Sequence, residues 1–352
     1  MKVLQVIDTL EAGGAEKVAV SYANSLVGKI EASYLCCTRK EGILKAQILD
    51  EVRYTFLNKR SFYDTKAYAR LYRFIRDNSV DTVHAHGTSY FMLSILKIFY
   101  GLDFQLYWHD HYGNSDHLQS RNKQILKVLS HQFSGIICVN PNLLQWASKE
   151  LNCNNIIYLP NFPEVPQTNT DTVNLLGDEH AIKIICVANL RKQKDHLNLL
   201  RAFEQLPENY SLHLFGHHFG DSYSSLLLES FKSSKKNASI FYYGSIPDIS
   251  SYIEKADIGV LASRSEGLPL ALLEYGFAGL KVVCTDVGNC KEVVGAYGII
   301  VPAEDSKALA DGIKNSLSLN SGHTISLKKR IDAKYSVDSI IPQLLKFYKS
   351  RA

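Results

Sequence analysis

Short apolar runs alternate along this chain with longer stretches in which apolar residues recur at helical spacing. Amphipathic segments such as 15–26 (AEKVAVSYANSL) separate runs of strand length. Continuous apolar strands alternating with helices are typical of a parallel sheet covered by helices. The pattern therefore predicts an α/β protein with strands at 2–7, 82–86, 104–109, 135–140, 183–189, 211–216, 240–244, 258–263 and 280–285.

A polar, proline-rich stretch divides this pattern into two halves. Residues 160–172 (PNFPEVPQTNTDT) hold three of the nine prolines, which is typical of a linker. Because 352 residues exceed one typical domain, we expect doubly wound domains at 1–165 and 166–335. A C-terminal helix is expected at 336–352, and its packing on the N-terminal domain is left open. Ligands of such sheets bind at the carboxyl ends of the strands.

Charge and cysteine content narrow the class of protein. A net charge of +4 is small for this length, which argues against a nucleic-acid partner. The first residues (MKVLQVIDTL) lack the apolar core of a signal peptide, and no run is long enough to span a membrane. The seven cysteines lie mostly in apolar runs, where they predict buried small hydrophobes in a reducing compartment. We expect a cytoplasmic protein.

Two loops have compositions suited to anions. In EAGGAEK, Gly13 and Gly14 precede a helix whose first amides could approach a diphosphate; a simple tight turn is the alternative. In NLRKQKDH, cationic side chains follow a strand, and they suit a leaving diphosphate unless the loop is merely solvated. These cations are Arg191, Lys192 and Lys194. No Asp-x-Asp occurs, so no metal or other cofactor is expected at the diphosphate.

The stretch SRSEGLPLALLEYGFAGLKVV places Glu266 and Glu274 eight positions apart around a Gly-Leu-Pro turn. This stretch resembles the signature of family 4 of the retaining, nucleotide-sugar-dependent glycosyltransferases. GGAEK, DTVHAHG at 81–87, the Ala-Asn-Leu-Arg-x-x-Lys loop and VGNCKEVV are similar to the same family and stand in the same order. The resemblance implies a GT-B fold, with two facing Rossmann-like domains and an interdomain cleft.

The resemblance also implies roles for particular residues. Glu274 would accept hydrogen bonds from the ribose hydroxyls of the donor, and Glu266 would bind hydroxyls of the donor sugar. His109, at the end of a strand, would contact the sugar near the reacting carbon, and Lys194 and Arg191 would bind the diphosphate. The backbone of the turn would approach sugar and phosphate at Gly267, Leu268, Pro269 and Leu270, and Pro269, which has no N–H, would stiffen the turn.

Several positions depart from the family pattern. Ala188-Asn189-Leu190 stands where many members have Gly-Arg-Leu, so it is left open whether Arg191 replaces that arginine. Tyr275 and Phe277 follow the second glutamate in place of small residues, and His196 stands where glycine is common. We expect these changes to alter packing or the nucleotide pocket.

A metal cluster is the alternative interpretation of the histidines around His109. His84 and His86 lie on one face of a predicted strand, and Asp110 and His111 follow His109 directly. Histidines two apart on a strand can share a metal ion, but no complete carboxylate or cysteine ligand set accompanies them. A packed, hydrogen-bonded histidine is the simpler interpretation of His84.

The resemblance predicts a retaining hexosyltransferase that uses a UDP- or GDP-sugar in surface polysaccharide or glycolipid synthesis. The acceptor would be a saccharide or a lipid-linked saccharide. Segment 65–77 (TKAYARLYRFIRD) has the spacing of a basic amphipathic helix, which could bind an anionic membrane surface; a helix packed on its own domain is the alternative. A peripheral location on the inner face of the cell membrane is therefore left open. Two other functions also stay open: a nucleotide-sugar epimerase, or an inactive sugar-nucleotide-binding partner subunit.

Overall fold

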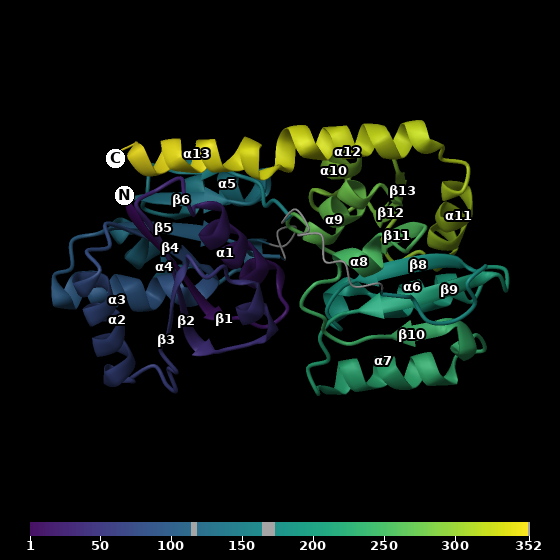
Figure 1. Ribbon diagram of the computed structural model, residues 1–352, viewed down its shortest axis with the longest axis horizontal. Helices are drawn as coiled ribbons and strands as arrows, with labels where there is room; N and C mark the ends of the chain where they lie inside the picture. Colours follow the sequence, from purple (N-terminus) through teal and green to yellow (C-terminus); the bar gives the residue numbers. More distant parts are fainter. Residues whose placement is uncertain (114–117, 164–172, 351–352) are drawn as a thin grey trace. The chain divides into compact units, whose positions relative to one another are not determined.

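The computed structural model describes residues 1–113, 118–163 and 173–350, and the chain divides into two compact units (Figure 1). Unit 1 comprises Met1–Phe162 and Val337–Ala352, and unit 2 comprises Pro163–Ser336. Most of the expected linker, 164–172, lies outside the described residues. The chain thus returns to unit 1 with its last helix.

Unit 1 is built on a parallel sheet of seven strands in the order β3-β2-β1-β4-β5-β6-β7. Its strands are β1 (Lys2–Thr9), β2 (Ala32–Lys40), β3 (Arg53–Phe56), β4 (Thr82–His86), β5 (Gln105–Asp110), β6 (Gly135–Cys138) and β7 (Ile156–Tyr158). Its helices are α1 (Gly14–Ser25), α2 (Thr65–Asp77), α3 (Tyr90–Tyr100), α4 (Gln124–Leu129), α5 (Pro141–Glu150) and α13 (Val337–Lys349).

Unit 2 repeats this plan with a parallel sheet of six strands in the order β10-β9-β8-β11-β12-β13. Its strands are β8 (Ile182–Val187), β9 (Tyr210–Phe215), β10 (Ile240–Tyr242), β11 (Ile258–Leu261), β12 (Lys281–Thr285) and β13 (Ile299–Val301). Its helices are α6 (His196–Phe203), α7 (Ser222–Ser233), α8 (Ser250–Ile253), α9 (Leu270–Ala278), α10 (Cys290–Val294), α11 (Ser306–Ser316) and α12 (Ser321–Tyr335).

All nine predicted strands are present, so the predicted α/β class and the two Rossmann-like sheets are confirmed. Residues such as Val6, Ile184 and Val260 are fully buried in these strands, which is why the strands read as continuous apolar runs. The sequence pattern missed β2, β3, β7 and β13. Three of these four strands, β3, β7 and β13, lie at sheet edges.

The strand order reverses direction once in each sheet, between β1 and β4 in unit 1 and between β8 and β11 in unit 2. Doubly wound sheets bind ligands at the carboxyl ends of the strands on either side of such a reversal. The loops after β8 and β11 contain most of the residues singled out in the sequence.

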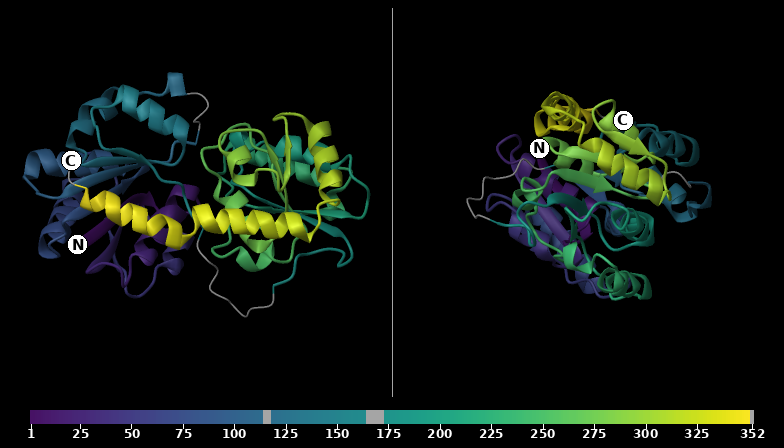
Figure 2. Two further views of the ribbon diagram at one scale, coloured as in Figure 1. Left: turned by 90° about the horizontal axis from the view of Figure 1, so that it is seen from above. Right: turned by 90° about the vertical axis from the view of Figure 1, so that its right-hand side faces the viewer.

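The last two helices, the long yellow ones in Figure 2, belong to different units. Helix α12 packs on α9, where a Cβ on Gly276 would meet Ile331 at 2.1 Å. Helix α13 packs on unit 1 through Phe347 and Tyr348, which lie against the ring of Tyr107.

In the part of the chain that the structure describes, no helix is long and apolar enough to cross a membrane.

Candidate active site

A buried ion pair joins the loops that follow β8 and β11. Lys194 Nζ lies 2.6 Å from Glu266 Oε1, and the hydroxyl of Ser263 donates to the same oxygen at 2.5 Å. Glu266 is only 4% exposed. A carboxylate buried this deeply needs such partners, because an unpaired buried charge is strongly destabilising. The structure therefore brings together two residues that the sequence places in separate motifs.

A second ion pair holds the same two loops. Arg264 donates from Nε to Asp195 Oδ2 at 2.8 Å and from Nη2 to Oδ1 at 3.3 Å, and its Nη1 lies 3.2 Å from Glu304. Asp195 has a left-handed backbone (φ 47°) at the start of α6, and its side chain is buried. The sequence analysis missed Arg264 and Asp195, although both stand inside the two motifs that it quoted.

The turn from Gly267 to Leu270 is buried and leads directly into α9. Pro269 is the N-cap residue of α9, and its side chain makes no capping hydrogen bond. The amides of this first turn, together with the helix dipole, are suited to an anion. Gly288 supports the turn: it has φ +49°, and a Cβ there would lie 1.9 Å from the carbonyl oxygen of Glu266.

Glu274 lies on α9, one turn into the helix, and is partly buried. The next residue, Tyr275, is fully buried, and its hydroxyl accepts a hydrogen bond from the amide of Val187 at 2.7 Å. The tyrosine ring occupies the space above Gly259 in β11, where a Cβ would meet ring carbons at 2.4 Å. The tyrosine that departs from the family pattern is thus accommodated by a glycine on the neighbouring strand.

Arg191 and Asn189 have other contacts than the sequence suggested. The guanidinium of Arg191 lies over the ring of Phe219, 4.5 Å from its centroid. Asn189 Oδ1 accepts a hydrogen bond from the backbone amide of His217 at 2.8 Å. The side chain at the position of the family arginine therefore fastens one loop to the next, and the ion pair with Glu266 is made by Lys194.

The two glycines after β1 differ in the space around them. A Cβ on Gly13 would lie 2.1 Å from Glu16 Oε2, whereas a Cβ on Gly14 would meet nothing within 4 Å. The Glu16 carboxylate folds back over the helix start and accepts a hydrogen bond from Thr9 at 2.9 Å. An anion approaching Gly13 would therefore meet a negative charge.

His109 belongs to a layer of buried histidines on one face of the unit 1 sheet. Strand pairing sets His109 beside His86, and His84 is two residues before His86 on the same face. All three residues are fully buried, and burial, together with the neighbouring histidines, lowers the pKa of each imidazole well below its ordinary value. The three rings are therefore neutral at pH 7.

Three side chains cover this histidine layer. The ring of Tyr22 from α1 lies 5.5 Å from that of His84 and 5.7 Å from that of His109. Tyr348 from α13 forms a hydrogen bond of 2.5 Å between its hydroxyl and His84 Nδ1. Phe162 packs on Tyr22. The role expected for His109 at the donor sugar stays a prediction.

Asp110, the residue after His109, forms an ion pair with an arginine. Arg121 donates to its two oxygens at 2.6 and 2.9 Å and stacks between the rings of Tyr112 and Trp146. Asp110 is thus held in a bidentate ion pair.

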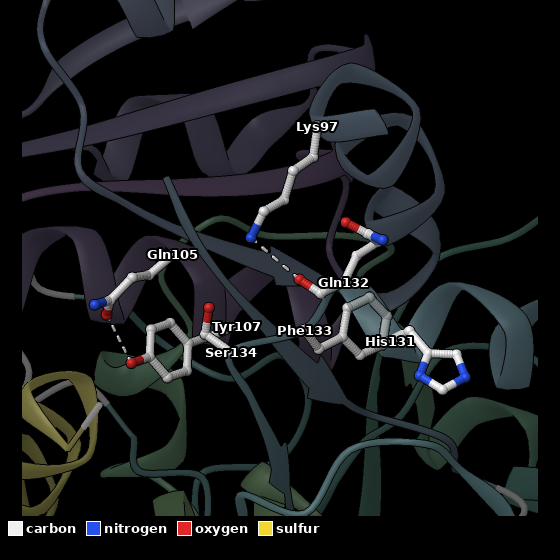
Figure 3. A pocket seen from close by; sticks show the side chains of 7 residues that line it. All are labelled: Lys97, Gln105, Tyr107, His131, Gln132, Phe133 and Ser134. Atoms are coloured by element: carbon white, nitrogen blue, oxygen red, sulfur yellow. Dashed lines mark hydrogen bonds between the residues drawn. The ribbon is translucent and has the colours of Figure 1, made fainter. Parts of the chain in front are cut away.

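A pocket of about 390 Å³ lies near the amino ends of β5 and β6 (Figure 3). His109 lies near the other, carboxyl end of β5. Lys97 borders it and donates to the carbonyl oxygen of Gln132 at 3.3 Å. None of the predicted site residues lines it. The pocket is lined by Lys97, Gln105, Tyr107, His131, Gln132, Phe133 and Ser134.

The apolar stripe of α2 packs on its own domain. Tyr68, Leu71 and Ile75 are buried in unit 1, so these side chains do not face a membrane, and membrane binding by the exposed side of the helix stays a prediction. Other apolar side chains are exposed beside it. We call them the α2–α3 patch: Phe62, Tyr63, Ile98, Phe99 and Tyr100.

Comparison with known proteins links both halves of the chain to sugar transfer. Residues 12–162 match the family model described as Glycosyltransferase Family 4, and residues 169–334 match the one described as Glycosyl transferases group 1. The O-antigen biosynthesis glycosyltransferase WbnH of Escherichia coli is 24% identical over 306 residues, which are 84% of each chain.

A Campylobacter jejuni enzyme is 23% identical over 331 residues, which are 88% of this chain and 87% of that one. Its name describes an alpha-1,4-N-acetyl-D-galactosaminyltransferase acting on a saccharide linked to PP-undecaprenol. Among solved structures, HepE of Anabaena in complex with UDP and glucose superposes with a TM-score of 0.83 at 15% identity, over 99% of this chain and 100% of that chain. The predicted GT-B fold is confirmed.

Proposed function

Since this chain belongs to family 4 of the glycosyltransferases, we propose that it moves a hexose-type sugar from a UDP- or GDP-sugar to a saccharide or lipid-linked saccharide. The observation that carries the proposal is the Lys194–Glu266 ion pair at the strand reversal of unit 2, beside the start of α9. It places a cation, a carboxylate and the first turn of α9 at the carboxyl ends of β8 and β11.

In this proposal the donor nucleotide binds to unit 2. The carboxylate of Glu274 accepts hydrogen bonds from both ribose hydroxyls, which a carboxylate can do with its two oxygens. Lys194, with Arg191 beside it, binds the diphosphate, and the amides at the start of α9 add a positive dipole. Lys194 then exchanges Glu266 for phosphate oxygens, and Glu266 becomes free to accept from hydroxyls of the sugar.

The proposed reaction retains the configuration of the sugar. The acceptor hydroxyl attacks the anomeric carbon on the face that the diphosphate leaves, and the bond from that carbon to the phosphate oxygen breaks. The hydroxyl proton passes to an oxygen of the leaving phosphate. Lys194 stabilises the charge that grows on the leaving group, and His109 contacts the sugar. The protein contributes mainly position and charge.

We propose that no metal ion assists the diphosphate. The cationic and dipolar groups of unit 2 support this: Lys194, Arg191 and the first amides of α9 supply positive charge at the strand reversal. Glu266, the nearest carboxylate, is engaged by Lys194 and Ser263.

The acceptor is proposed to be presented at an anionic membrane, in surface polysaccharide or glycolipid synthesis. Two observations support this: relatives named for O-antigen and undecaprenol-linked saccharides, and the α2–α3 patch. Exposed cations lie on α2 and in the segment before it, at Arg60, Lys66, Arg70 and Arg73. Exposed apolar side chains combined with basic ones suit the surface of an anionic bilayer.

The first test is a thermal-shift titration of the protein with UDP, GDP, ADP and NAD, each in EDTA. Ligands that bind the native state raise the unfolding temperature, so we expect UDP or GDP to stabilise the wild type. Glu274→Ala should abolish the shift, whereas Glu229→Ala, an exposed glutamate on α7, should keep it. A shift that survives in Glu274→Ala contradicts the assignment of the ribose contact.

Turnover separates the proposed reaction from its alternatives. Release of nucleotide that requires an added saccharide acceptor identifies a transferase. Conversion of the donor into its epimer without an acceptor identifies an epimerase, and nucleotide binding without any turnover identifies an inactive partner subunit.

A further inference from the structure

The histidine layer of unit 1 combines three imidazoles in one buried place. His84, His86 and His109 each offer a ring nitrogen, and these nitrogens all lie within 4.8 Å of one another. The pairing of β4 with β5 fixes this arrangement, because it sets His86 directly beside His109. Backbone register rather than flexible loops therefore positions the three side chains.

Several polar atoms in this layer have no hydrogen-bond partner. Both ring nitrogens of His109 and Nε2 of His84 are buried without one, as are the hydroxyl of Tyr22 and Nε2 of Gln5. Most buried polar groups are hydrogen-bonded, and each orphan costs about 1–3 kcal/mol. Three of these five atoms are imidazole nitrogens of His84 and His109, and this indicates that a polar ligand completes the layer.

We propose that the histidine layer is a binding site for a divalent transition-metal cation, with zinc as the best match, ligated by His84, His86 and His109. Neutral imidazole is a preferred ligand of zinc, and three histidines make a common ligand set. The set includes no carboxylate, which argues against magnesium and calcium, because these ions prefer oxygen ligands.

The remaining ring nitrogens have partners that suit this role. His86 donates from Nε2 to Gln5 Oε1 at 2.8 Å, which leaves Nδ1 as the ligand atom. His84 donates from Nδ1 to the Tyr348 oxygen at 2.5 Å in the tautomer whose Nε2 is free to ligate. Histidines that bind metals usually donate their other N–H to such a group, which fixes ring and tautomer.

Closing the site requires the imidazole rings to rotate out of their stacked arrangement, because the lone pair of each nitrogen lies in the plane of its ring. Two nitrogens on one tetrahedral zinc lie about 3.3 Å apart, given zinc–nitrogen bonds of about 2.0–2.1 Å, whereas the three nitrogens are now separated by up to 4.8 Å. The rings are now nearly parallel, at 18–19° between His84 and its two neighbours. His86 Nδ1 is hydrogen-bonded to His111 Nε2 at 3.0 Å, so a cation bound here would replace this hydrogen bond and could take His111 as a fourth ligand.

This proposal does not rest on the proposed sugar transfer. It concerns the interior of unit 1, whereas the diphosphate is assigned to unit 2. An imidazole that ligates a cation through one nitrogen keeps an N–H on the other, so His109 could serve both roles.

The test uses the full chain, purified without a histidine tag, freed of metal with a chelator and titrated with cobalt. Tetrahedral cobalt bound to histidines absorbs strongly in the visible range, and we expect one cobalt ion per chain, displaced by zinc. His84→Gln should abolish the absorption. Tyr348→Phe, which removes only the outer hydrogen bond, should weaken binding about 10- to 100-fold.

His180→Gln is the matched control, because it removes an imidazole whose side chain is 86% exposed; it should bind cobalt like the wild type. If the variants do not fold, the wild type alone decides: zinc, and not magnesium, should raise its unfolding temperature by several degrees. A wild type that binds no cobalt, a spectrum unchanged in His84→Gln, or no thermal shift with zinc each overturns the proposal.

Discussion

Lys194 and Glu266 come from loops 72 positions apart, and each makes the other's burial tolerable. A lysine alone at the end of a strand is ordinary, and a nearly buried glutamate alone would be costly. Together they form an ion pair that a bound diphosphate can break, because phosphate oxygens compete with the carboxylate for the ammonium group of Lys194. The role that we propose for each residue is therefore inferred from the ion pair and not from either residue alone.

We predict that Lys194→Ala lowers kcat about 100-fold or more while changing KM little. A group that meets charge developing on the leaving diphosphate acts mainly in the transition state. The variant should also lose roughly 1–3 kcal/mol of unfolding free energy, because Glu266 stays buried without its cation. Steady-state kinetics and urea unfolding measure the two effects.

Lys192→Ala is the matched control for this prediction. Lys192 stands in the same short 3-10 helix, Lys192–Lys194, but is exposed. Both its turnover and its stability should stay near those of the wild type. Turnover of Lys194→Ala equal to that of the control would remove Lys194 from the mechanism.

At the scale of elements, the central strands were the easiest to read from the sequence, and among the short edge strands only β10 (IFY) was predicted. The central strands are buried on both faces and appear as apolar runs, whereas β3 (RYTF) and β7 (IIY) are partly exposed and only three or four residues long. Strand β2 (ASYLCCTRK) is mostly buried but contains serine, threonine and tyrosine, which interrupt the apolar run. Edge and mixed strands gain their identity from the neighbour they pair with.

Gly288 and Gly279 test how the turn before α9 is held. Both have positive φ, but a Cβ on Gly288 would collide with the Glu266 carbonyl, whereas one on Gly279 would meet nothing within 4 Å. We predict that Gly279→Ala costs about 1 kcal/mol from backbone strain alone. Gly288→Ala should cost more and should also weaken UDP or GDP binding, because it displaces the turn.

Urea unfolding and the nucleotide thermal shift measure these two effects on the same samples. Equal losses of stability in both variants, with nucleotide binding intact, would show that the loop after β12 does not support the site.

The α2–α3 patch predicts membrane binding at the same scale. Aromatic contacts between Phe62 and Phe91 and between Tyr72 and Tyr100 connect the two helices. We expect the double variant Tyr63→Asp, Phe99→Asp to lose co-sedimentation with anionic lipid vesicles, because it exchanges two of the most exposed aromatic side chains, 83% and 77% exposed, for charges that anionic lipid repels.

Ile325→Asp provides the comparison, since this apolar side chain is 52% exposed on α12 of unit 2. It should sediment with vesicles like the wild type. Wild-type protein that stays in the supernatant, with or without anionic lipid, would disprove the membrane role of the patch.

At the scale of the whole molecule, the chain completes unit 1 with its last helix. Phe347 packs on Tyr107 and fills the space above Gly135, where a Cβ would meet its ring at 2.6 Å. Tyr348 reaches the histidine layer, and its carbonyl oxygen accepts from the hydroxyl of Tyr107 at 3.1 Å. The fold of unit 1 is therefore complete only when α13 has packed against it.

We predict that Phe347→Ala lowers the unfolding free energy of unit 1 by about 3–5 kcal/mol, the usual cost of deleting a buried phenylalanine. The protein offers a selective probe, because its two tryptophans, Trp108 and Trp146, both belong to unit 1. The tryptophan-detected transition should move to lower urea, while UDP or GDP binding by unit 2 is unchanged. An unmoved transition would mean that α13 contributes little to unit 1.

By itself, the sequence determined the class and the two sheets, because central parallel strands must be apolar. It also determined the family, because short motifs are recognised by their residues and their order along the chain. It also placed Lys194 and Glu266 in the loops that follow two of the predicted strands. Only the tertiary structure decided that these two residues pair and that Arg264 holds Asp195. It also decided that the apolar side of α2 faces inward and that three histidines from two strands meet in one layer under α13. Those facts depend on strand register and on which faces pack together, and a sequence pattern records the polarity of each position but not its neighbour.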